Sequence, residues 1–210
     1  MSVQQLDDKP LENLSLDEIH TLFRQRVRPE VIEHVMGAAE TESTLERNRA
    51  ALDRLLFRQR IFHDVTDPNT SIELFGHRLP SPALIGPVGS FRQLRKNGEH
   101  EVAKGGSLFG TMVFISGATQ STVDQWSEGI SSPLVYMAYL SKGRDKVLNA
   151  VRRAEELGYA AVGLTMDTLQ PTKLKDRIPL SSNGKARTVH PSSPDDVTWL
   201  KKEVSIPVVV

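Results

Sequence analysis

Apolar and polar residues alternate in blocks along this chain, and the blocks predict its secondary structure. Five short apolar runs, rich in β-branched residues, are typical of strands buried in a parallel sheet. They lie at residues 82–86, 111–116, 133–139, 160–166 and 206–210. The segments between them predict helices near residues 98–108, 121–126, 145–157 and 194–202. Strands that alternate with helices over short links predict a parallel sheet covered by helices.

Such a sheet either stays open or closes into an eight-stranded barrel. The pattern favours an α/β fold of the TIM (β/α)₈ type that is incomplete, with the first four βα units plus a fifth strand. The last strand, residues 206–210, is wholly apolar and ends the sequence. We therefore expect an open strand edge that promotes association, and a sequence that is the first part of a larger barrel.

The organisation along the chain predicts two regions. Residues 1–70 are expected to form an N-terminal helical region, and residues 71–210 the partial barrel. Within the barrel, residues 177–194 are rich in Ser, Pro, Gly and Lys, which predicts a long mobile loop. The segment 72–79 predicts a hairpin that turns near Gly76.

The helical region carries start and stop signals. Ser15 with Glu18, and Ser43 with Glu46, have the spacing of capping boxes. Gly37 is expected to end a short helix between them. After the second cap, a set of leucines is spaced to line one helix face. These are Leu45, Leu52, Leu55 and Leu56.

Composition narrows the classes of partner and site. The 26 basic and 26 acidic side chains balance, so no nucleic-acid partner is expected. The absence of cysteine excludes disulfides, thiolate nucleophiles and cysteine-metal sites. The histidines lack His-x-x-x-His spacing, so no metal site is expected. Without an apolar secretion signal or a membrane span in the sequence, a cytoplasmic location is expected.

Candidate chemistry gathers where the predicted strands end. In α/β barrels the site lies at the C-terminal ends of the strands, and small or hydroxyl residues recur at those ends here. The strand-end positions are Pro87, Val88 and Gly89, then Ser116 and Gly117, then Met137 to Tyr139, then Thr165 to Asp167. Taken singly, each is also typical of a turn or a helix cap. Their placement on four successive strand ends favours a site for a flat ligand that the backbone approaches closely.

Seven short segments also match a known family in their order and spacing. They are residues 44–48, 56–61, 64–66, 84–89, 97–99, 152–155 and 164–168. Through them, residues 31–210 resemble the FMN-dependent α-hydroxy-acid oxidases and dehydrogenases, a family that includes glycolate oxidase, lactate oxidase and mandelate dehydrogenase. The resemblance implies an oxidoreductase with FMN as cofactor, which oxidises a 2-hydroxy acid to a 2-oxo acid when complete.

The resemblance also implies cofactor contacts. The backbone of Pro87, Val88 and Gly89 matches segments that contact the flavin ring in this family. Ser116 and Thr165 match residues that hydrogen-bond the polar edge of the ring. We therefore expect these five residues to bind the ring of FMN rather than its phosphate.

Catalytic and substrate roles follow from the same resemblance. Tyr139 matches a tyrosine that holds and polarises the substrate, and Asp167 matches the carboxylate that stabilises a protonated catalytic histidine. Three positions depart from the family pattern. Met137 replaces a flavin-binding glutamine, His34 replaces a substrate-binding tyrosine, and Lys173 lies near the place of a substrate-binding arginine.

The resemblance places the catalytic histidine, its partner arginine and the FMN phosphate site beyond Val210. We therefore expect this chain alone to lack oxidation activity and to bind FMN weakly. Two alternatives remain open at this point: an inactive half-barrel that acts as a binding or assembly module, and one half of a split enzyme. The expected partners are a second copy of the chain or a complementing C-terminal half.

Overall fold

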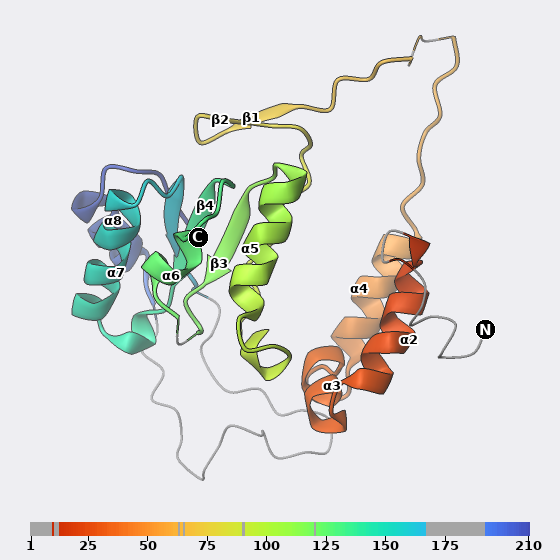
Figure 1. The fold of residues 1–210 in the computed structure, drawn as a ribbon, viewed down its shortest axis with the longest axis horizontal. Coiled ribbons are helices and arrows are strands. Elements are labelled where there is room, and N and C mark those ends of the chain that lie inside the picture. The colour runs from red at the N-terminus through yellow and green to blue at the C-terminus, as the bar shows by residue number, and fades with distance from the viewer. Residues whose placement is uncertain are drawn as a thin grey trace. The chain divides into compact units, whose positions relative to one another are not determined.

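The computed structural model describes residues 10, 13–62, 64, 66–89, 91–119, 121–166 and 192–210. The described residues up to Arg58 form one compact unit, and those from Gln59 onward form a second (Figure 1). The predicted region boundary at residue 70 stays a prediction. Residues 177–191 of the predicted loop lie outside the described residues.

The first unit consists of helices in its described part. They are α2 (Leu16–Arg26), α3 (Pro29–Met36) and α4 (Ser43–Asp53). The capping box at the start of α2 is confirmed, since the Glu18 N–H donates to Ser15 Oγ at 3.3 Å and the Ser15 N–H donates to Glu18 Oε2 at 2.7 Å. Gly37 ends α3 as expected.

The second predicted capping box is wrong. Glu42, in a left-handed conformation with φ of 62°, is the N-cap of α4, so Ser43 is already the first helical residue. The predicted leucine face is also wrong, because α4 ends at Asp53, before Leu55 and Leu56. In the described structure, no residue of α4 is buried.

The second unit contains the predicted parallel sheet. Its strands are β3 (Val113–Ser116), β4 (Leu134–Ala138), β5 (Ala161–Leu164) and β6 (Val208–Val209), and they pair in that order. All three pairings are parallel. Each strand coincides with a predicted apolar run, which confirms four of the five predicted strands.

The strand predicted at residues 82–86 is reduced to a single bridge between Ile85 and Val113. The Ile85 N–H donates to the Met112 carbonyl at 3.1 Å, and the Phe114 N–H donates to the Ile85 carbonyl at 2.8 Å. Proline has no N–H to donate, and this run begins at Pro82 and is followed directly by Pro87. A longer ladder is therefore not formed along this edge of the sheet.

Helices follow the strands along the chain and pack on one face of the sheet (Figure 1). They are α5 (Gly98–Phe109), α6 (Val123–Ser127), α7 (Arg144–Glu156) and α8 (Pro194–Glu203), which confirms the predicted helices. The apolar faces of these helices pack against every second side chain of the strands, and together they form one hydrophobic core. Its fully buried members include Ala103, Val113, Val151, Ala154, Val162 and Leu200.

A hairpin packs on the other face of the sheet. It pairs β1 (Ile72–Leu74) with β2 (His77–Leu79) in antiparallel fashion, as predicted. Phe75 and Gly76 at its turn have φ of 49° and 76°, the positive values that a type I′ turn requires. The hairpin contributes to a second apolar cluster with Met112, Val135 and Met137 of the sheet.

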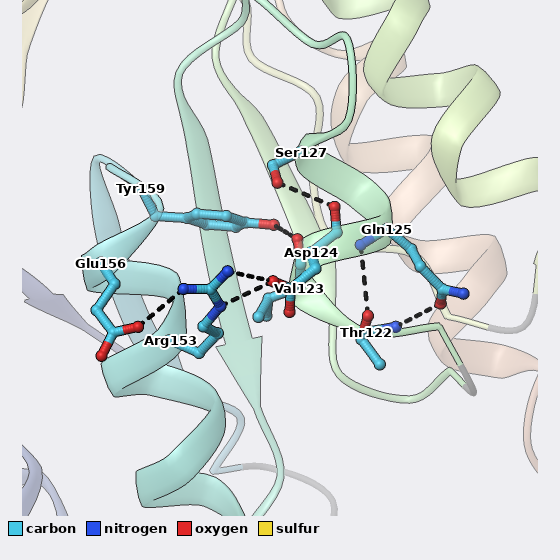
Figure 2. A network of polar contacts seen from close by, with 8 residues as sticks. All are labelled: Thr122, Val123, Asp124, Gln125, Ser127, Arg153, Glu156 and Tyr159. Atoms are coloured by element: carbon cyan, nitrogen blue, oxygen red, sulfur yellow. Dashed lines mark hydrogen bonds and ion pairs between the residues drawn. The ribbon is translucent and has the colours of Figure 1, made fainter.

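A polar network joins α6 to α7 (Figure 2). The Tyr159 hydroxyl, just after α7, donates to the Val123 carbonyl at 2.8 Å. Arg153 Nε donates to Asp124 Oδ1 at 2.7 Å, and Arg153 Nη1 donates to Glu156 Oε2 at 2.9 Å. The hydrogen bond from Arg153 lowers the pKa of Asp124, and burial raises the pKa of Tyr159.

Replacing Tyr159 with phenylalanine is expected to lower the free energy of unfolding by about 1 kcal/mol, because it removes one buried hydrogen bond. Urea denaturation would measure the change. Tyr139→Phe is the matched control, since the Tyr139 hydroxyl has no hydrogen bond to any described residue, and it should leave the midpoint unchanged. Equal midpoints for the Tyr159→Phe variant and the parent would show that this hydrogen bond contributes nothing.

Candidate functional site

One face of the sheet carries the predicted polar residues. Met112, Val135 and Met137 belong to the cluster on the face opposite the helices. Because side chains alternate along a strand, Ser116 and Tyr139 fall on this same face. Backbone pairing continues past β5, where the Thr165 N–H donates to the Ala138 carbonyl at 2.9 Å.

A cavity of about 560 Å³ lies at the C-terminal ends of these strands. Its lining residues are Pro87, Phe114, Met137, Tyr139, Leu164, Thr165, Met166, Val209 and Val210. The walls are mainly apolar, and the hydroxyls of Tyr139 and Thr165 supply polar groups. Within the described part of the chain, no lysine, arginine, aspartate or glutamate side chain lines it. This size and character suit a flat, largely apolar ligand.

The cavity brings together some of the predicted cofactor residues but not all. Pro87 and Thr165 line it, whereas Val88 is 54% exposed and does not. Ser116 is 2% exposed and its Oγ accepts a hydrogen bond from the Ala118 N–H at 3.2 Å. A Cβ built on Gly89 would lie 3.4 Å from Ser116 Oγ, so these two residues adjoin each other, but neither lines the cavity.

The predicted catalytic and substrate residues are placed only in part. Tyr139 lines the cavity and is half-buried. His34 is exposed in the last turn of α3, in the first unit. Asp167 and Lys173 lie outside the described residues. All of these role assignments stay predictions.

Met137 forms an apolar part of the cavity wall where the family resemblance expects a glutamine. A Cβ built on Gly163 would lie 2.6 Å from Met137 Sδ, so the thioether fills the space beside Gly163. A thioether cannot donate a hydrogen bond. This part of the wall therefore offers contact but no donor to a ligand.

The sequence reasoning missed several residues of the site. Four further cavity residues are apolar: Phe114, Leu164, Val209 and Val210. The alternation of side chains could have found Phe114, which lies two residues before Ser116. Lys142 was also missed. Its Nζ donates to the Gly117 carbonyl at 2.5 Å, and burial together with the charge of Lys146 lowers its pKa.

A second cavity, of about 340 Å³, lies between α5 and α6 and has a different character. Its lining is polar and of mixed charge, with Glu99, Lys104 and Glu128 among the residues. Glu99 is 4% exposed, and its Oε1 has no hydrogen-bond partner among the described residues. Among those residues there is also no cluster of His, Cys, Asp or Glu suited to a metal ion. None of the predicted site residues lines this cavity, so the first one is the candidate site.

The sequence pattern of the FMN-dependent dehydrogenases matches residues 23–187. Glycolate oxidase of Spinacia oleracea is 30% identical over 158 residues, which cover 75% of this chain and 43% of that protein. L-lactate dehydrogenase of Haemophilus influenzae (strain PittEE) is 30% identical over 157 residues, covering 75% of this chain and 41% of that protein. The chain thus spans about two fifths of the length of these curated relatives.

Solved structures confirm the fold. A crystal structure of mandelate oxidase aligns with a TM-score of 0.81 at 25% identity, covering 92% of this chain and 60% of that one. A mutant flavocytochrome b2 with pyruvate bound aligns over 98% of this chain and 56% of that one, with a TM-score of 0.85 at 23% identity. The parallel α/β sheet therefore corresponds to part of a TIM barrel, as the sequence predicts. No helix within the described ranges is long and apolar enough to cross a membrane.

Proposed function

Because this chain belongs to the FMN-dependent α-hydroxy-acid dehydrogenase family, we propose that the cavity at its strand ends holds the ring system of FMN. The observation that carries the proposal is the cavity itself, about 560 Å³ in volume, with mainly apolar walls and two hydroxyls. A flavin ring has broad apolar faces and a polar edge, so this lining fits it. The backbone near Pro87 and the hydroxyl of Thr165 would contact the ring.

In this proposal the complete protein oxidises a 2-hydroxy acid to a 2-oxo acid. FMN, when bound, supplies the electron acceptor. Tyr139 lines the same cavity, which supports the proposal that its hydroxyl donates a hydrogen bond to a substrate lying against the ring. Asp167 would stabilise the imidazolium that forms when a histidine, acting as general base, takes up the substrate's proton, the role that the family resemblance implies. The pyruvate bound to flavocytochrome b2, a structural relative, is itself a 2-oxo acid.

The lining also predicts which part of FMN this chain recognises. An FMN phosphate carries about two negative charges, and phosphate sites rely on basic groups or helix N-termini. Since the described lining of the cavity contains no basic residue, the ring should contribute most of the affinity. We therefore expect riboflavin, which lacks the phosphate, to bind this chain within about threefold of FMN.

Titration of both flavins into the purified chain, followed by flavin fluorescence, would test this proposal. Thr165→Val is a variant of matched shape that removes one hydroxyl, and it should weaken both flavins by about two- to tenfold. No binding of either flavin would show that the cavity is not a ring site. FMN binding more than about a hundredfold tighter than riboflavin would show a phosphate site within this chain. Assays with glycolate, lactate and mandelate on the same samples would report any turnover.

A further inference from the structure

A short loop after β3, residues 117–119, contacts two segments that lead into the candidate site. On one side, the Gly117 N–H donates to the Met137 carbonyl at 2.7 Å, and a Cβ on Gly117 would lie only 2.8 Å from that oxygen. On the other side, a Cβ built on Gly89 would lie 3.0 Å from the Ala118 Cβ. The loop therefore contacts both the end of β4 and the segment that follows Pro87.

Lys142 donates hydrogen bonds to the same loop. It ends the short 3₁₀ helix Leu140–Lys142, which follows β4. Its Nζ donates to the Gly117 carbonyl at 2.5 Å and to the Thr119 carbonyl at 3.4 Å. Among the described residues, no carboxylate forms an ion pair with Lys142. Both hydrogen bonds of its ammonium group go to carbonyls of this loop. Charge-assisted hydrogen bonds of this kind are stronger than neutral ones.

We propose that Lys142 is a positioning residue of the flavin site. Its ammonium group fixes residues 117–119, and the fixed loop contacts Met137, which lines the cavity, and Gly89, two residues after the lining residue Pro87. Lys142 does not itself line the cavity, so it acts through the loop. The effect on flavin binding rests on the proposed function, whereas the ordering of the loop does not.

The chain contains no cysteine, which permits a chemical test at this one position. Lys142→Cys introduces a single thiol. Its reaction with 2-bromoethylamine forms a C–S bond, releases bromide and restores an ammonium group at nearly the length of lysine. Reaction with 2-bromoethanol gives an adduct of the same length with a neutral hydroxyl. The two adducts differ in charge and donor strength but not in size.

The first measurement is hydrogen exchange at the amides of Gly117 and Ala118, which both donate hydrogen bonds in the structure. We expect these amides to exchange about tenfold faster in the hydroxyethyl adduct than in the aminoethyl adduct. Amides of β4 should exchange alike in both, which controls for loss of fold. The same two adducts at Lys146→Cys are the matched control, because Lys146 has no hydrogen bond to this loop.

The second measurement is riboflavin affinity, which separates positioning from direct attraction of a phosphate, since riboflavin is uncharged. We expect the dissociation constant to rise about tenfold in the hydroxyethyl adduct and to recover in the aminoethyl adduct. Equal exchange in the two adducts would overturn the proposal, as would a difference in exchange with equal riboflavin affinity. A difference in exchange with no flavin binding by any form, the parent included, would keep the loop anchor and reject the flavin site.

Discussion

Replacing Gly106 with alanine is expected to lower the free energy of unfolding by about 1–3 kcal/mol. Gly106 lies on the face of α5 that packs against β3, and a Cβ there would lie 2.2 Å from Val113 Cγ2. Val113 is fully buried and β-branched, so it has few alternative rotamers. Alanine would therefore force helix and strand apart along the centre of the core.

The neighbouring glycine provides the control. Gly105 is exposed, and a Cβ built on it would meet no atom within 4 Å. Both substitutions gain the same helix propensity, about 1 kcal/mol for glycine to alanine. Gly105→Ala should therefore stabilise the chain while Gly106→Ala destabilises it, as urea denaturation of the two variants would show. A Gly106→Ala variant as stable as Gly105→Ala would contradict the close packing of α5 on β3.

The sheet could be predicted because local sequence and tertiary environment agree. β5 itself, Ala161–Leu164, carries no polar side chain and is buried at every position, as expected for a strand covered on both faces. The run at residues 82–86 was predicted as a strand because it is as apolar as the others, but it forms only a single bridge. Pro82 and Pro87 have no N–H to donate to a ladder, and the apolar pattern alone does not take this into account. In the helical region, Ser43 has the right spacing for a cap, but the left-handed conformation of Glu42 starts the helix one residue earlier.

The sequence could predict those residues of the candidate site that lie at the C-terminal ends of strands. Tyr139 and Thr165 were found because the polar residues of parallel strands meet at one edge of the sheet. Lys142 could not be found, since its partner Gly117 is 25 residues away and is contacted through its backbone carbonyl. A carbonyl is present at every residue, so no sequence signal marks it. Gly106 and Gly105 likewise look the same in sequence, and only packing distinguishes them.

Replacing Met137 with glutamine is expected to strengthen flavin binding by up to about tenfold. Met137 lines the proposed ring site, and its thioether offers no hydrogen-bond donor. A glutamine amide of similar length could donate to a carbonyl at the polar edge of the ring. One added neutral hydrogen bond contributes about 0.5–1.5 kcal/mol, and 1.4 kcal/mol corresponds to a factor of ten in affinity.

Met137→Leu is the matched control, because leucine keeps an apolar wall without adding a donor. Its riboflavin affinity should stay within about twofold of the parent, while that of Met137→Gln rises. In the absence of flavin the glutamine variant should be less stable, since the residue is 7% exposed and its amide would be buried without a partner. Riboflavin should therefore raise the melting temperature of the glutamine variant more than that of the leucine variant. If both variants bind riboflavin as the parent does, the polar edge of the ring does not lie against residue 137.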